Sequence, residues 1–228
     1  MLHKTRGIVL SAFKYRETSL IVRIFTEALG MQSYIVQGVR AKRPRYSVAL
    51  FQPMTLLDLV VYHKKQASLQ RIAEAKYHTP TNNILGNLKK ATIAVFLAEL
   101  LTKLLREEAP NPTLFDFLWQ SVLELDGLHT GEALFHLHLM LKMAPYLGFG
   151  ISQAQELETQ LQRAGQHEGL TIEVKRLLEA LLQGTTLNAQ WAGKAVRRSL
   201  LANILKFYQL HTEGLDTLKS LKVMQELG

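Results

Sequence analysis

The 228-residue chain contains no cysteine. This absence excludes a disulfide framework, a zinc site with thiolate ligands and a cysteine nucleophile. Long apolar runs are also missing: the most apolar stretch, residues 91–105 (ATIAVFLAELLTKLL), is interrupted by Glu99 and Lys103. It is shorter than the roughly 20 residues that a membrane span needs. Because the N-terminus MLHKTRGIVL carries charges where a signal peptide needs an apolar core, we expect a soluble, intracellular protein without membrane association.

Patterns typical of catalysis are scarce as well. No stretch has the closely spaced glycines followed by Lys and Ser or Thr that form a phosphate-binding loop, and LGFG at residues 147–150 is better interpreted as a helix end. His136 and His138 lie two residues apart on a predicted helix, so they point about 200° apart and cannot share a metal ion. We expect one of them at the surface and the other half-buried. The acidic residues form no cluster that could hold magnesium. We therefore predict a protein that is not an enzyme and has no cofactor and no metal.

The sequence has an excess of positive charge, which is unevenly distributed along the chain. Residues 1–78 contain 13 Lys and Arg against 4 Asp and Glu, whereas residues 79–228 contain 14 against 15. The whole excess behind the net charge of +8 thus lies in the first third of the chain. Such asymmetry is typical of a polyanion-binding module joined to a nearly neutral body.

The first third is predicted to be a small barrel. Five short segments rich in β-branched and aromatic residues are separated by turns. They cover residues 7–15, 19–26, 31–39, 54–63 and 68–78. Five strands suit the OB-fold, a common oligonucleotide-binding barrel. The fifth segment is ambiguous, because its Ala, Glu and Lys residues also tolerate a helix.

From residue 79 onward the apolar residues recur at three- and four-residue spacing, which predicts helices. The segments cover residues 87–108, 112–126, 131–149, 152–164, 171–183, 193–213 and 215–227. Asn83, Asn111 before Pro112, and Thr171 are candidate helix starts. The apolar stripes predict a core and not a cofactor site. We predict an α+β protein: an OB-fold nucleic-acid-binding domain at residues 1–78 and an all-α helical domain at residues 79–228.

One loop concentrates the charge of the barrel. The segment GVRAKRPRYS at residues 38–47 lies between two predicted strands. Because its cations repel one another and its proline cannot donate to a sheet, we expect it to be mobile and poorly packed. A charged loop that only aids solubility is the alternative, but further cations lie in neighbouring turns. The predicted DNA-binding residues are Arg6, Lys14, Arg16, Arg40, Lys42, Arg43, Arg45, Lys64 and Lys65.

Aromatic side chains in the same region could add stacking platforms for bases. Phe13, Tyr15, Tyr34 and Tyr46 are the candidates. For each of them, burial in the barrel is the competing interpretation.

The order and spacing of several motifs over the first 70 residues resemble one known family. They are the strand Gly-Ile-Val-Leu at residues 7–10, the turn YRETS at 15–19, Phe25-Thr26 with Gly30 after it, the basic loop, and Phe51-Gln52-Pro53. The helical half continues the similarity at residues 107–126 and 146–150. The sequence resembles the RecO family of bacterial DNA-repair and recombination mediators.

The resemblance implies an N-terminal OB-fold, a helical domain and a function in recombination. Family members bind single- and double-stranded DNA, anneal complementary strands, and act with RecR to help RecA displace single-stranded DNA-binding protein (SSB). It also implies a cytoplasmic, nucleoid-associated protein. Many members carry a cysteine zinc site after the position of YLGFG, and the present sequence has no cysteine there. We expect helix packing to supply what zinc stabilises elsewhere.

The C-terminal tail of SSB, which is acidic and ends in an apolar residue, is the protein ligand that the resemblance implies for the helical half. Such a tail needs cations beside an apolar pocket. The candidate partner-binding residues are Lys142, Lys194, Arg197 and Arg198, the last three predicted to share one helix face. An RNA-binding OB-fold protein, a metal-dependent nuclease and a non-catalytic adaptor remain open as alternatives.

Overall fold

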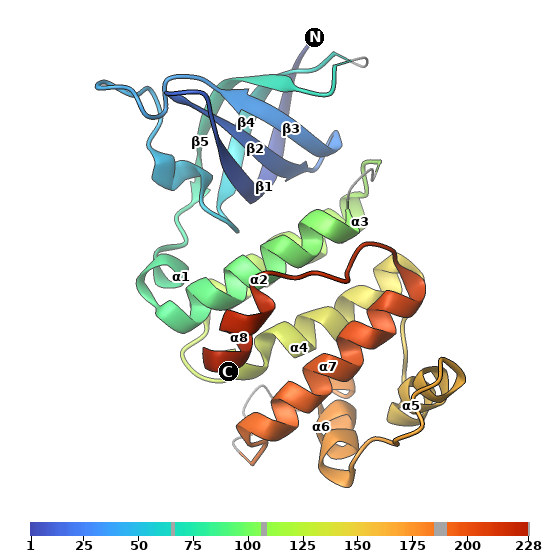
Figure 1. Ribbon diagram of the computed structural model, residues 1–228. Helices are drawn as coiled ribbons and strands as arrows, with labels where there is room; N and C mark the ends of the chain where they lie inside the picture. Colours follow the sequence, from blue (N-terminus) through green and yellow to red (C-terminus); the bar gives the residue numbers. More distant parts are fainter. Residues whose placement is uncertain (65–66, 106–108, 185–190, 228) are drawn as a thin grey trace. The chain divides into compact units, whose positions relative to one another are not determined.

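The computed structural model describes residues 1–64, 67–105, 109–184 and 191–227 (Figure 1). Contacts divide the chain into two compact units. The first contains Met1–Gly86 and Ala94–Asp126, and the second contains Asn87–Ile93 and Gly127–Gly228. The domain boundary between residues 78 and 79 stays a prediction.

Five strands close the barrel of the first unit. They are β1 (Leu2–Tyr15), β2 (Ser19–Thr26), β3 (Gly30–Val36), β4 (Leu56–Tyr62) and β5 (Gln70–Thr79). Their order around the barrel is β1-β2-β3-β5-β4, with a single parallel pairing between β3 and β5. The predicted OB-fold and the α+β class are confirmed.

The long first strand bends to serve both sides of the barrel. Its first half pairs with β4 and its second half with β2, with a register irregularity between Val9 and Ser11. Gly7 permits the close packing of side chains from β2 and β4 against β1, because a Cβ atom there would lie 2.6 Å from a methyl carbon of Ile24 and 2.7 Å from one of Leu59. The predicted strand began only at Gly7. The structure adds residues 2–6, which pair with β4, so Arg6 is a strand residue.

The ambiguous fifth segment is a strand, because it pairs with β4 along most of its length. The barrel core is formed by inward-facing aliphatic side chains and two aromatic ones, Tyr34 and Phe51. A short 3-10 helix, η1 (Val48–Phe51), was not predicted; its start is capped by the Ser47 side chain.

Three helices follow the barrel: α1 (Asn82–Gly86), α2 (Leu88–Leu104) and α3 (Pro112–Gly127). The Asn111 side chain accepts a hydrogen bond from the Leu114 N–H at 3.0 Å, so its predicted capping role is confirmed. Asn83 is wrong as a cap, because it lies inside α1; Asn87 caps α2 instead, accepting from Lys89 and Lys90. In the first unit, Phe115 of α3 contacts Phe25 of β2, with ring centroids 5.8 Å apart.

The second unit is helical, as predicted. It contains α4 (Glu132–Met143), η2 (Ala144–Leu147), α5 (Ala154–Arg163), α6 (Ile172–Leu182), α7 (Lys194–His211) and α8 (Leu221–Leu227). The helix predicted over residues 131–149 ends at Met143, because Pro145 begins the tighter turn of η2. The predicted Thr171 cap is confirmed. Within the described residues, no helix combines the length and the apolar character that crossing a membrane requires.

Candidate nucleic-acid interface

Two loops are joined at one end of the β2–β3 pair. The β1–β2 turn contains Arg16 in a left-handed conformation (φ 53°), and the Arg16 guanidinium lies 5.3 Å from the ring centroid of Tyr15. The backbone N–H of Arg40, in the basic loop, donates to the carbonyl of Thr18 at 3.1 Å. This bond brings the exposed cations Lys14 and Arg16 next to the basic loop.

The basic loop is anchored at both ends and exposed between them. Val39 is buried in the barrel core, and the Tyr46 hydroxyl donates to the Ala73 carbonyl at 3.2 Å. The loop projects from the barrel at the upper left of Figure 1. The expectation of poor packing is thus wrong at the two ends, because an apolar side chain and a phenol fix them; mobility stays a prediction. The exposed cations are Arg40, Lys42, Arg43 and Arg45.

Acidic partners for these four cations are lacking in the part of the chain that the structure describes. Arg45 contacts an aromatic face, with its guanidinium 5.2 Å from the Tyr46 ring centroid. The positive charge of the loop is therefore neither neutralised nor buried. A phosphate could reach it without displacing an internal ion pair.

The β4–β5 loop is held by a buried glutamine. Gln70 accepts from the Lys64 N–H and donates to the carbonyls of Lys64 and Ala67. The Lys64 side chain is exposed. Lys65 lies outside the described residues.

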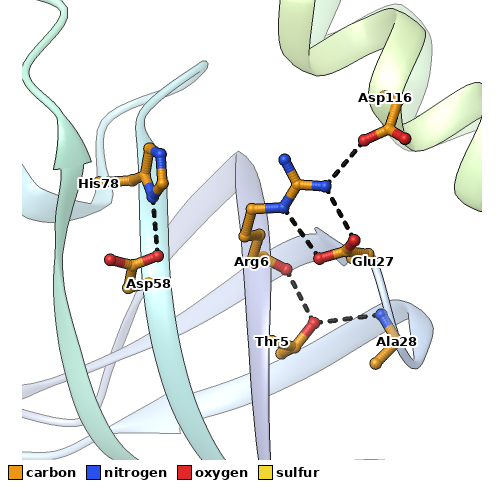
Figure 2. Close-up of polar contacts among 7 residues, drawn as sticks. All are labelled: Thr5, Arg6, Glu27, Ala28, Asp58, His78 and Asp116. Carbon is orange, nitrogen blue, oxygen red and sulfur yellow. Dashed lines mark hydrogen bonds and ion pairs between the residues drawn. The ribbon is translucent and has the colours of Figure 1, made fainter.

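Arg6 is committed to contacts inside the first unit (Figure 2). Its Nε and Nη2 donate to the two carboxylate oxygens of Glu27 at 2.9 and 2.8 Å, and Nη2 also donates to Asp116 at 2.8 Å. The guanidinium lies 5.2 Å from the Phe115 ring and 5.0 Å from the Trp119 ring.

The titration behaviour of this pair follows from the contacts. The hydrogen bonds to Glu27 hold the pKa of Arg6 above its usual value, and the same bonds hold the pKa of Glu27 below its own. Arg6 therefore has two carboxylates as counter-ions. Of the nine predicted DNA-binding residues it is the least suited to a phosphate.

A groove of about 690 Å³ lies on the barrel around Arg6. Its charges are of both signs: Asp58 contacts His78 at 2.8 Å and Lys76 at 3.6 Å. The hydrogen bond from His78 is the main reason why the pKa of Asp58 is lowered. Mixed charge makes this groove a poor site for a polyanion. The lining residues are Lys4, Thr5, Arg6, Glu27, Arg45, Tyr46, Asp58, Leu59, Val60, Glu74, Ala75 and Lys76.

The four candidate stacking residues differ in accessibility. Tyr34 is fully buried, and burial raises the pKa of its hydroxyl; it cannot contact a base. Tyr15 and Tyr46 are half-buried, and each lies against an arginine. Phe13 on β1 is 52% exposed and is the most accessible of the four.

Two further cations on the β2–β3 side of the barrel were missed by the sequence analysis. Arg23 on β2 is half-buried, and Arg71 on β5 is exposed. Register places Arg71 opposite Ile35 of β3 and therefore on the β2–β3 side of the barrel. The alternation of side chains along a strand was sufficient to predict that both arginines point outward. Which strands lie next to them follows only from the pairing of β3 with β5, two strands about 35 residues apart in the sequence.

The candidate partner-binding residues of the second unit differ in exposure and in contacts. Arg197 is half-buried, and its Nη1 donates to the Ala192 carbonyl at 2.6 Å. Lys194 donates to the Glu226 carbonyl, whereas Arg198 is exposed. These three residues lie in the first turns of α7 at the predicted spacing, but Arg197 is less exposed than the other two. Lys142, at the end of α4, is exposed.

The histidines of α4 are more buried than expected. His136 is 3% exposed and His138 is half-buried, so neither lies at the surface. Burial, with the nearby Arg197 charge as a lesser cause, lowers the pKa of His136 to about 3. Among the described residues, no group of three metal-ligating side chains could hold an ion.

A carboxylate organises the segment between α5 and α6. Glu158 is 7% exposed, accepts from the Leu170 N–H at 3.0 Å and pairs with Lys175 at 2.8 Å. The Ala154 N–H at the start of α5 donates to Glu179 of α6 at 2.6 Å. Helix packing alone was expected to hold this region. Polar bonds contribute as well, because a buried carboxylate satisfies the loop backbone.

Comparison with known proteins assigns both halves of the chain. Residues 1–81 match the family model for the recombination protein O N terminal, and residues 85–222 match that for the recombination protein O C terminal. DNA repair protein RecO of Flavobacterium psychrophilum is 33% identical over 98% of both chains. DNA repair protein RecO of Bacteroides fragilis is 34% identical over 100% of this chain and 99% of its own. The chain belongs to the RecO family of DNA repair proteins.

Proposed function

We propose that this protein is a recombination mediator that binds single- and double-stranded DNA without sequence preference and promotes strand annealing. The observation that carries the proposal is the group of four exposed cations on the basic loop, which have no acidic partner in the described chain and adjoin the cations of the β1–β2 turn. Family membership directs the choice of ligand to DNA.

Phosphate binding by mobile cations accounts for the lack of sequence preference. Each phosphate contact releases condensed counter-ions, and this gain is the same for every base sequence. Annealing needs no catalytic group: neutralising two backbones lowers the repulsion between strands and leaves the bases free to pair. The proposed protein therefore acts without an active site.

Within this proposal, the DNA-binding residues are the loop and turn cations together with Lys64. Arg6 leaves the set, because Glu27 and Asp116 neutralise it. Lys65 stays a candidate from the sequence alone. The protein would work in the bacterial cytoplasm, on the nucleoid.

The proposed protein partners are RecR and SSB, with RecA loaded indirectly onto SSB-coated single strands. For the acidic SSB tail, Lys142 and Arg198 are the better candidates, since both are exposed. Lys194 and Arg197 already donate to backbone carbonyls.

The test is a titration of labelled single-stranded and duplex DNA at several salt concentrations. Replacing Arg40, Lys42, Arg43 and Arg45 by Ala should weaken binding to all sequences alike. The slope of log affinity against log salt should become shallower by about 3 to 4 units.

A matched control removes the same charge from exposed positions of the second unit. That control should keep the wild-type slope, and an unchanged slope in the loop variant would show that the loop is only solvated. Competition with RNA distinguishes the alternative of an RNA-binding OB-fold protein, and a wild type without any salt-dependent binding would favour a non-catalytic adaptor. The control substitutions are Lys89→Ala, Arg163→Ala, Lys219→Ala and Lys222→Ala.

A further inference from the structure

An apolar row crosses the outer face of three adjacent strands. Phe13 of β1 is opposite Ile21 of β2, and Ile21 is opposite Ile35 of β3. Ile21 and Ile35 point outward, because their strand neighbours Val22 and Val36 are buried in the core. Phe13 lies on the same face, because it is paired with Ile21. Phe13 is 52% exposed, and the two isoleucines are half-buried.

Cations flank this row. Ile35 is opposite Arg71 of β5, which is exposed. The next outward row consists of Ser11, Arg23 and Ser33, paired across the same three strands. The Ser11 hydroxyl is buried without a hydrogen-bond partner among the described residues. This face of the barrel therefore carries an apolar row with Arg71 next to Ile35 and with Arg23 in the neighbouring row.

The dimensions of the row suit nucleobases. Neighbouring strands lie about 4.8 Å apart, so three side chains in a row span roughly 10 Å. A flat ring and two branched aliphatic side chains offer no hydrogen bonds and no charge. They gain by covering the face of an unpaired base, whereas a duplex hides its base faces in the stack and presents only its phosphates and groove edges.

We propose that this apolar row, Phe13 with Ile21 and Ile35, contacts the faces of unpaired bases and so adds affinity for single strands but not for duplex. The inference rests on the proposed DNA binding. Charge complementarity favours a nucleic acid as the occupant, because Arg23 and Arg71 flank the row and the β1–β2 turn begins three residues after Phe13, at Arg16. The basic loop binds both forms of DNA through phosphates, and the row distinguishes between them.

The experiment measures fluorescence anisotropy of the full-length protein with three labelled ligands. These are a single strand, the same strand with abasic sites at its centre, and the corresponding duplex. Phe13→Ala should weaken binding of the complete single strand about tenfold and change duplex binding less than twofold. The wild type should bind the abasic strand more weakly than the complete strand, and Phe13→Ala should remove this difference.

Two variants serve as controls. Phe13→Tyr keeps a stacking ring and should bind like the wild type. Tyr77→Ala removes another exposed aromatic ring from the barrel and should also bind like the wild type. If Phe13→Ala lowers the melting temperature, Phe13→Leu, which keeps an apolar side chain without a ring, replaces it and should give a smaller loss on the complete single strand with duplex binding unchanged.

Several results would overturn the inference. If Phe13→Ala weakens binding of the single strand and of the duplex equally, the row contributes only to packing of the barrel. If the wild type binds the abasic and the complete strand equally well, the row does not contact bases. A concentration-dependent dimer that Phe13→Ala dissociates would make the row an interface between copies. A wild type that binds no DNA at all would refute the proposed function itself, whereas intact duplex binding with any of these results would refute only the row.

Discussion

Replacing Arg6 tests whether this residue stabilises the fold or binds DNA. Arg6 makes two charge-assisted hydrogen bonds to Glu27, a third to Asp116, and cation–π contacts with Phe115 and Trp119. Its side chain is 30% exposed. We expect Arg6→Ala to destabilise the first unit and to leave the salt dependence of DNA binding unchanged.

The magnitude follows from what the substitution removes. A hydrogen bond to a charged group contributes about 1.5–3 kcal/mol, and a cation–π contact about 0.5–1 kcal/mol near the surface. The carboxylates left behind are 37% and 60% exposed and can be hydrated, so they do not become buried charges. Allowing for this screening, Arg6→Ala should cost about 2 kcal/mol.

The assay uses a tryptophan of the first unit as a local probe. Trp119 is buried beside Arg6, and the only other tryptophan, Trp191, is 46% exposed. In a Trp191→Phe background, urea unfolding followed by fluorescence reports on the first unit alone. With a typical slope of about 2 kcal/mol per molar urea, the midpoint should fall by about 1 M. Lys76→Ala, which removes an exposed cation 3.6 Å from Asp58, should hardly change it.

The effect of acid gives a second readout with a definite sign. The pKa of Glu27 is lowered in the folded state, mainly by the Arg6 hydrogen bond, from an ordinary value of 4.5. The stability from this pair is therefore fully present above about pH 5 and is lost as the pH falls below 4.5. The gap between wild type and Arg6→Ala should shrink at pH 3. An unchanged urea midpoint with a salt slope shallower by about one unit would refute this reasoning and make Arg6 a phosphate ligand.

Two predictions concern the second unit. Because the Glu158 carboxylate binds the backbone of the α5–α6 segment, Glu158→Ala should lower Tm by about 5 °C, with a smaller loss for Glu158→Gln. Chelator should leave Tm unchanged, and one equivalent of tightly held zinc in the purified protein would contradict this. For the SSB tail, anisotropy with a labelled tail peptide should show weaker binding for Lys142→Glu and for Arg198→Glu with DNA binding retained. If the wild type does not bind the tail peptide, the proposal that SSB is a partner is wrong.

Local pattern was sufficient to predict the barrel, because its strands alternate and its turns are marked by polar and glycine residues. The register was not predictable. The parallel pairing of Ile35 with Arg71 joins residues far apart in the sequence, and no local periodicity encodes that neighbourhood. The apolar row and the flanking arginines follow from this pairing, so the sequence showed Phe13 as a candidate but not its partners.

The sequence likewise shows which residues are charged, but it does not show which of them form ion pairs in the fold. Arg6 and Arg40 look equally basic in the chain, yet Arg6 meets Asp116, which is 110 residues away. The expectation that one of His136 and His138 lies at the surface was wrong, because two histidines two residues apart on a helix give no sign of the neighbours, such as Arg197 near His136, that the fold places beside them.

These pairings change what the net charge of the first 78 residues means. Glu27 and Asp58, half of the four acidic residues of this segment, are bound to Arg6 and to Lys76 with His78. Their negative charge therefore cancels strand cations on one part of the barrel and forms no ion pair with the loop cations. The local field at the basic loop is more positive than the average over the segment suggests, and charged polymers respond to this local field. An acidic substitution should accordingly weaken DNA binding far more in the loop than beside Arg6.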